Sequence, residues 1–339
     1  MNSNSILRGE KRGLKHYLTN KYWVISIALF CAVLWGSAFP VLKVSYAELG
    51  IAPNDQSAII VLAGMRFFLA AILIFILIIA GIRQSPKVRR QMLPQLFLLG
   101  LLQISLQYFF FYNGLAHTSG MKGAILSSAG TFFVVVLAHF VYVNDRLNWR
   151  KLFGITAGFA GIIMINAGAR FTLDFSWQGE GFMILSGLVS AIGTILAKRL
   201  SKEVHPFVLT AWQMLLGSLL LIATGLPGLK PQAMVFTNRA FLLLIYSAFL
   251  SATAFSLWYA ILKYNKAGEI SVYKFMTPVS GAILSAFFIP GERLTLNMFM
   301  ALVLVALGVI IVNYRRRSPK EEILSEGPYW VDERGSRLE

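Results

Sequence analysis

The hydrophobic residues of the chain fall into long runs separated by short polar connectors. A helix of about twenty apolar residues can span the roughly 30 Å hydrocarbon core of a bilayer, because it rises about 1.5 Å per residue. Ten runs come close to this length, at residues 22–44, 57–80, 93–114, 119–143, 150–168, 181–199, 206–226, 239–262, 267–289 and 296–314. The pattern predicts an all-α polytopic membrane protein with about ten transmembrane helices.

Composition and charge agree with a membrane protein. Only 14% of the residues are charged, whereas soluble domains average about 25%. The net charge of +16 comes from basic residues scattered over the connectors, and this pattern excludes the single basic face of a nucleic-acid binder. If the N-terminus is cytoplasmic, the cytoplasmic segments hold about four times as many Lys and Arg as the opposite ones. This bias is typical of cytoplasmic loops, so we expect a cytoplasmic (inner) membrane protein with both termini in the cytoplasm.

The two halves of the chain superpose at an offset of 147 residues. Asp145-Arg146-Leu147 then aligns with Glu292-Arg293-Leu294, and Tyr112 aligns with Tyr259. Each copy holds five predicted spans, and this odd number requires the second copy to enter the membrane upside down. Inverted repeats of this kind place a substrate site near the membrane midplane, at the interface between the repeats.

The repeat predicts four segments along the chain. They are a basic cytoplasmic N-terminus at 1–21, a first five-helix unit at 22–168, a second at 179–315, and a disordered cytoplasmic tail at 316–339.

Several short motifs recur in an order that resembles a known family. They are Leu34-Trp35-Gly36-Ser37-Ala38-Phe39, Met65-Arg66-Phe67-Phe68-Leu69-Ala70-Ala71, Thr277-Pro278-Val279 and Pro290-Gly291-Glu292-Arg293-Leu294. With these motifs the chain resembles the EamA-type permeases of the drug/metabolite transporter superfamily over residues 22 to 315. The resemblance implies transport of a small metabolite and structural roles for Arg66, Pro278 and Glu292. The first copy departs from the family pattern, with Thr131 and Asn144-Asp145 in place of the usual Pro and Gly-Glu.

Lys274 is the most informative polar residue within the predicted spans. It lies one turn before Pro278, on a helical stripe of mostly small residues, and its repeat mate is Ser127. Close helix packing explains small residues in such a stripe. It does not explain a lysine, which needs water or an anion inside the membrane. We therefore expect Lys274 and Ser127 to face the substrate.

Other residues are candidates for the same site. Gln103 and Gln107 share one helix face and bind either the cargo or a neighbouring helix. Arg66 either faces the cavity or ties helix ends together. Glu269 lies at the cytoplasmic mouth of the ninth span, and unless this residue relays protons, transport is expected to be uncoupled. The aromatic residues predicted to lie near the cavity are Trp35, Tyr112, Trp212, Trp258 and Tyr259.

The sequence contains no recognisable motif for catalysis or for metal binding. The four histidines include no pair at i, i+4, there is no HExxH motif, and the one cysteine, Cys31, lies in the first run. A membrane-embedded enzyme needs such groups, so we predict neither an enzyme nor a cofactor. The preferred function is secondary transport by alternating access, with export of amino acids or similar amphipathic metabolites. The alternative is uptake or exchange of an anionic metabolite. The protein is expected to be a monomer or a homodimer.

Overall fold

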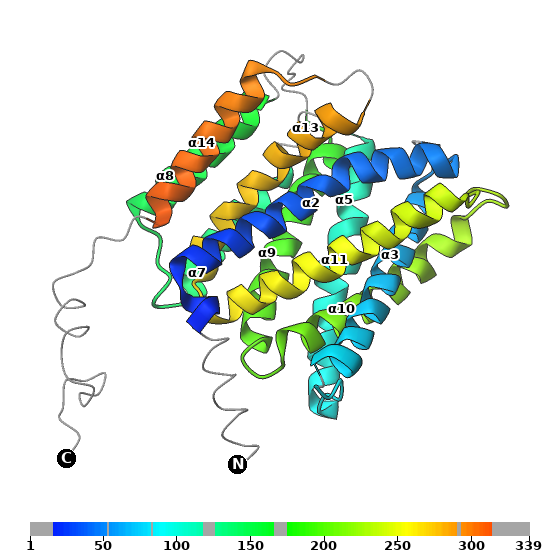
Figure 1. The fold of residues 1–339 in the computed structure, drawn as a ribbon, viewed down its shortest axis with the longest axis horizontal. Helices are drawn as coiled ribbons and strands as arrows, with labels where there is room; N and C mark the ends of the chain where they lie inside the picture. The colour runs from blue at the N-terminus through cyan, green and yellow to red at the C-terminus, as the bar shows by residue number, and fades with distance from the viewer. Residues whose placement is uncertain are drawn as a thin grey trace.

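The computed structural model describes residues 16–52, 54–82, 84–117, 126–165, 175–289 and 293–313. In these ranges the regular elements are all helices (Figure 1). In chain order they are α2 Lys21–Leu49, α3 Gln56–Ile76, α4 Leu93–Gly100, α5 Gln107–Ala116, α7 Ala129–Val141, α8 Trp149–Ile165, α9 Phe182–Leu200, α10 Pro206–Gly225, α11 Asn238–Tyr264, α12 Ala267–Ser271, α13 Met276–Phe288 and α14 Leu296–Asn313. Glu292 and the predicted tail at 316–339 lie outside the described residues, as do positions 1–15.

Short π-helical and 3₁₀ segments extend or join these helices into longer spans. Leu77–Ile82 extends α3, Leu101–Leu106 joins α4 to α5, Trp177–Gly181 precedes α9, and Val272–Phe275 joins α12 to α13. Seven helical segments of the described chain are long and apolar enough to cross a membrane, while α7 and α14 are shorter apolar helices. The prediction of an all-helical, multi-pass membrane protein is confirmed.

Each major contact between helices has an equivalent contact in which the two halves of the chain are interchanged. α2 packs against α13 and α11, just as its counterpart α9 packs against α7 and α5. In the same way, α3 contacts α11 where α10 contacts α4. The equivalent helices α3 and α10 contact each other directly, as do α8 and α14, which lie side by side in Figure 1. This arrangement is the one expected of two inverted five-helix repeats.

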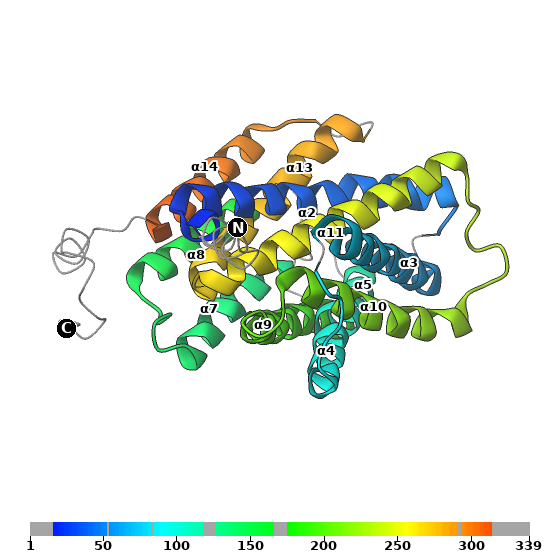
Figure 2. The same ribbon diagram turned by 60° about the horizontal axis from the view of Figure 1, so that its bottom comes forward.

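The loops that carry most of the basic residues meet at one end of the bundle. Hydrogen bonds there join Asn265 to Leu18, Gly268 to Asp145 and Trp212 to Pro86. We call this the basic end, because the described part of the chain has there Lys21, Lys87, Arg89, Arg90, Arg146, Arg150, Lys151, Lys198, Arg199, Lys202, Lys263 and Lys266. Figure 2 shows the same bundle after a rotation of 60°, with α2 and α11 running beside each other.

Large apolar side chains cover much of the outer surface of the bundle. Phe97, Phe132, Phe249, Phe288 and Phe299 are all exposed. A surface of contiguous exposed apolar residues is unfavourable in water, whereas lipid chains are as apolar as these side chains. The surface is therefore suited to contact with lipid.

Glycines allow the third and seventh spans to approach closely. A Cβ atom on Gly100 would lie 2.7 Å from the carbonyl oxygen of Gln213 and 3.0 Å from the backbone nitrogen of Gly217. Both neighbours are backbone atoms, so they cannot move aside as a side chain can. This contact between α4 and α10 sets the distance from the third span to the second unit.

We expect Gly100→Ala to destabilise the protein by about 1–3 kcal/mol, the usual cost of overpacking. The measurement is the Tm of the purified protein in detergent. Gly81→Ala is the control, because the nearest atom to its Cβ is the end of the Leu77 side chain, at 2.9 Å. Equal Tm values for the two variants would contradict the assigned contact.

Candidate functional site

A cavity of about 500 Å³ lies between the two five-helix units. Its walls come from α2, α3, α5, α7, α9, α11, α13 and the two short segments that hold Gln103 and Lys274. Cavities of a few hundred cubic ångströms are typical of small-molecule sites. The cavity is therefore large enough for a small metabolite.

The cavity opens at the end of the bundle opposite the basic end. Lys43, Tyr46, Gln56 and Leu115 line this part, and they lie where α2 ends, α3 begins and α5 ends. Lys43 and Leu115 are exposed. At the inner end of the cavity the lining includes Lys274 and stops short of the loops of the basic end, as far as the described residues show.

Eight of the nine residues predicted to bind substrate line this cavity. They are Trp35, Gln103, Gln107, Tyr112, Ser127, Trp258, Tyr259 and Lys274. Trp212 does not line it. The Trp212 indole lies at the basic end, where Nε1 donates a hydrogen bond to the carbonyl oxygen of Pro86 at 2.9 Å and the ring packs edge-on against Phe75.

The ninth span is broken at Lys274 because of Pro278. A proline lacks the N–H that would bond to the carbonyl four residues earlier, and its ring crowds that carbonyl. The carbonyl in question belongs to Lys274, and the chain there forms a 3₁₀ turn, Val272–Phe275, in which the N–H of Met276 points to the carbonyls of Tyr273 and Lys274. This turn positions the lysine on the cavity wall between α12 and α13.

The Lys274 ammonium lies between two indole rings. Its Nζ atom is 5.0 Å from the ring centroid of Trp258 and 5.5 Å from that of Trp35. Cation–π contacts of this kind stabilise a charged group partly removed from water. Among the described residues, no carboxylate forms an ion pair with Lys274. The indole Nε1 of Trp258 and the hydroxyl of Thr277, both on cavity-lining residues, also lack a hydrogen-bond partner in the described chain.

Arg66 is part of the cavity wall and is only 4% exposed. Its guanidinium carbon lies 4.3 Å from the Phe67 ring centroid and 5.5 Å from that of Tyr108. Its Nε has no partner among the described residues. The repeat mate of Arg66 is Gln213, whose Oε1 accepts a hydrogen bond from Tyr259 at 2.8 Å.

The charged residues of the cavity lining are all cationic. They are Lys43, Arg66 and Lys274, and neither Asp nor Glu occurs in the lining formed by the described residues. Since a cleft lined by one sign of charge concentrates ligands of the other sign, the cavity favours anionic groups. Glu269 lies outside it, at the basic end, where it pairs with Lys266 at 3.2 Å.

The two glutamines of the third span differ in their partners. The Gln103 amide donates to the carbonyl of Ser190 at 2.8 Å and to the Thr194 hydroxyl at 3.2 Å, so it fastens the third span to α9. The Oε1 atom of Gln107 has no partner within the described part of the chain. Gln107 is therefore the glutamine that remains available to a ligand.

Sequence reasoning missed several aromatic residues of the lining. Tyr108 precedes Tyr112 by four positions, and Phe255 precedes Trp258 and Tyr259 by three and four. Residues at these spacings share a helix face, so the spacing could have identified both. Ring contacts connect Tyr108 through Phe67 and Phe255 to Trp35, forming one aromatic wall.

The chain is similar to known transporters in sequence and to a solved structure in fold. The model of the EamA-like transporter family matches residues 22–167 and again residues 177–314. An uncharacterized transporter of Archaeoglobus fulgidus is 27% identical over 87% of this chain and 100% of its own length. The uncharacterized transporter YvbV of Bacillus subtilis is 26% identical over 86% of this chain and 92% of its own. The uncharacterized inner membrane transporter YedA of Escherichia coli is 25% identical over 84% of this chain and 89% of its own length.

A solved structure matches the fold with a TM-score of 0.70 at 15% sequence identity. The match covers 87% of this chain and 97% of the other. At this identity the match supports the fold alone.

The two glutamines should respond differently to substitution. Gln103→Leu removes the bonds to α9 and leaves polar groups unpaired, so we expect it to lower stability by about 1–3 kcal/mol. Gln107→Leu should leave the Tm of the purified protein near that of the parent and alter ligand binding instead. A larger loss of Tm for Gln107→Leu than for Gln103→Leu would contradict this assignment.

Proposed function

The chain belongs to the EamA-like transporter family, and from this premise we propose that it exports a small amphipathic metabolite with a carboxylate group, such as an amino acid. In this proposal the two inverted units rock around the cavity, which is open to one side of the cytoplasmic membrane at a time. Members of the family are transporters, and this agrees with the prediction that the chain is not an enzyme.

The charge of the cavity carries the proposal. Three cationic side chains and no carboxylate lie among the described lining residues, so an acidic group on the cargo meets only favourable charges. Trp35, Phe255 and Tyr108 offer an apolar wall to the rest of the molecule. Lys274 is the proposed partner of the carboxylate, because no protein carboxylate pairs with it in the described chain.

Export is the direction that needs the least coupling. For a cargo with one net negative charge, an inside-negative membrane potential favours export by about 2.3 kcal/mol per 100 mV. A zwitterionic amino acid has no net charge and is driven by its own gradient alone. Proton-coupled carriers commonly use an intramembrane carboxylate or histidine as a relay, and Glu269 is the nearest candidate at the basic end. We therefore propose that transport is uncoupled, driven by the gradient of the cargo and by the potential.

A second function is favoured by the same three cations. Exchange or uptake of a more strongly anionic metabolite would engage Arg66 together with Lys274, on α3 and on the 3₁₀ turn before α13. A cargo with two acidic groups would then bind more tightly than one with a single acidic group.

A binding screen tests the proposal. A ligand that binds only the folded state raises the apparent Tm of the protein. The Tm of the purified protein is therefore measured with each of several amphipathic carboxylates and, separately, with the corresponding primary amide. The proposal expects stabilisation by one or more carboxylates and none by the matching amides. Equal stabilisation by a carboxylate and its amide would contradict the assignment of an acidic cargo.

Lys274→Ala should weaken binding of a stabilising carboxylate by about 1.5–3 kcal/mol, the value of a hydrogen bond to a charged group. Binding of a neutral analogue should change little. Lys274→Arg should restore only part of the affinity, because the planar guanidinium needs different space. The control is Lys230→Ala, which removes an exposed lysine outside the cavity lining. Parent-like binding of both ligands by Lys274→Ala would mean that the lysine has no role in recognition.

We also propose that the basic end faces the cytoplasm, since cytoplasmic loops are enriched in Lys and Arg. In a Cys31→Ala background, Ser85→Cys at the basic end should resist an impermeant thiol reagent in intact cells, and Lys230→Cys at the other end should react. The reverse pattern of labelling would invert the topology.

A further inference from the structure

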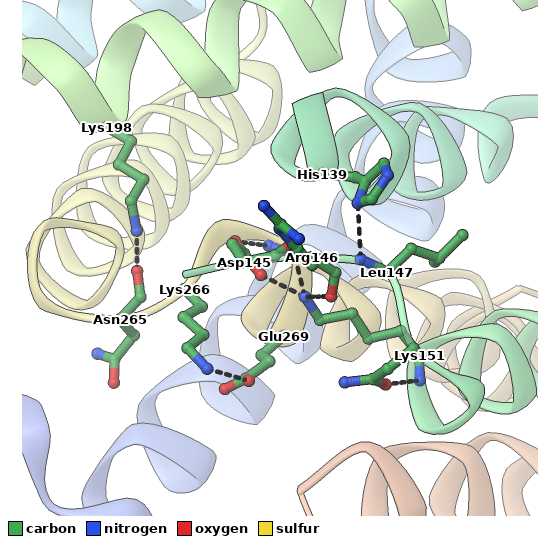
Figure 3. Close-up of polar contacts among 11 residues, drawn as sticks. His139, Asp145, Arg146, Leu147, Lys151, Lys198, Asn265, Lys266 and Glu269 are labelled. Atoms are coloured by element: carbon green, nitrogen blue, oxygen red, sulfur yellow. Dashed lines mark hydrogen bonds and ion pairs between the residues drawn. The ribbon is translucent and has the colours of Figure 1, made fainter. Parts of the chain in front are cut away.

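A buried ion pair lies at the basic end, beyond the cavity lining. Asp145, in the loop between α7 and α8, pairs with Lys151 at the start of α8, and the two side chains are 1% and 2% exposed. The Lys151 ammonium also donates to the carbonyl oxygens of Asp145 and Arg146, both at 2.9 Å (Figure 3). All of the donors of this lysine are therefore used within the loop.

The same carboxylate reaches across to the second five-helix unit. Oδ2 of Asp145 accepts a hydrogen bond from the backbone N–H of Gly268 at 2.9 Å. Gly268 is the second residue of α12, where the ninth span begins. A Cβ atom on Gly268 would lie 3.0 Å from Oδ1 of Asp145 and 3.3 Å from Nζ of Lys151. The glycine thus allows the backbone to lie directly against the ion pair.

This contact lies at the closed end of the cavity. From Gly268 the chain passes Ser271 and reaches Lys274 within six residues. Ser271 is 0% exposed, and its hydroxyl has no partner among the described residues. Ser271 lies between Gly268 and Lys274 along the chain, so it can report movement of α12 away from Asp145.

The two units differ in these residues. At the offset of 147 residues Asp145 corresponds to Glu292, whereas Lys151 corresponds to Met298. The lysine of the pair therefore has no cationic counterpart at that position in the second unit. At this pair of positions, the two units therefore differ in their capacity to form an ion pair.

We propose that Asp145, Lys151 and the N–H of Gly268 form a latch that holds the basic end closed and so favours the conformation open at the opposite end. The latch rests on the proposed transport function and specifies what controls its cycle. The ion pair itself stays within the first unit, so the hydrogen bond from the Gly268 N–H to the Asp145 carboxylate is the contact that holds α12 against the loop. Lys151 holds that carboxylate in position. When α12 moves away, water reaches both charges, and the two conformations can interconvert.

The test measures access to Ser271 from the basic end. Ser271→Cys is made in the Cys31→Ala background, and inside-out vesicles are treated with an impermeant maleimide. The parent should react slowly, and Lys151→Met, which copies the second unit, should react about tenfold faster, because the labelling rate follows the population open at the basic end. Lys202→Met is the control, since Lys202 is an exposed lysine at the same end, and it should leave the rate unchanged.

Asp145→Asn provides a second variant, which keeps the size of the side chain and an acceptor for Gly268. It should also raise the labelling rate, by a smaller factor than Lys151→Met. The variant should remain monodisperse, which shows that it is still folded. Unchanged labelling in both variants would overturn the latch, even if their Tm values fall, because that result would assign the pair to stability alone. The readout needs no cargo, so a failed latch and a failed cargo assignment are distinguishable.

Discussion

A positive charge in the middle of an apolar helix bundle is unfavourable unless water, an anion or aromatic rings accompany it. Lys274 puts such a charge between the two units, and the surrounding structure accommodates it. Pro278 breaks the ninth span at this residue, two indoles flank the ammonium, and the cavity leaves space for water or a ligand. A leucine at this position would need none of these features, and together they form the site that we propose for the acidic group of the cargo.

The two units share a backbone arrangement but differ in the residues that matter for transport. Lys274 corresponds to Ser127, Arg66 to Gln213, and Lys151 to Met298. The first two pairs line or adjoin the cavity, so a cargo meets different chemistry on its two sides. The third pair lies away from the cavity and bears on which end of the protein is closed. The repeat therefore relates the two units in backbone arrangement, while these side chains make them chemically unlike.

The sequence could predict the helices and the repeat because both depend on patterns along the chain. Apolar runs are long enough to span a bilayer, and one offset aligns the turn at Asp145 with that at Glu292. Lys274 and Ser127 could be predicted to face the interior, because close helix packing accounts for small residues on a stripe but not for a lysine among them. Both line the cavity.

Other features depend on how helices rotate and pack against each other, which a single sequence does not determine. The sequence pattern places Trp212 with the cavity aromatics, yet its indole bonds to Pro86 at the basic end. Gln103 and Gln107 share a helix face, and only the structure distinguishes the one that holds α9 from the one with a free acceptor. The contact of Asp145 with Gly268 is not evident from the sequence either, because it joins residues 123 positions apart.

Counterflow in proteoliposomes tests the central claim most directly. Vesicles that hold the purified protein are preloaded with an unlabelled carboxylate ligand, and the same compound is added outside at trace concentration with a radiolabel. A carrier that opens to one side at a time predicts a transient accumulation of label above equilibrium, and none when the vesicles are preloaded with the primary amide. Label that only equilibrates, at the same rate with either preload, would contradict alternating access through this cavity.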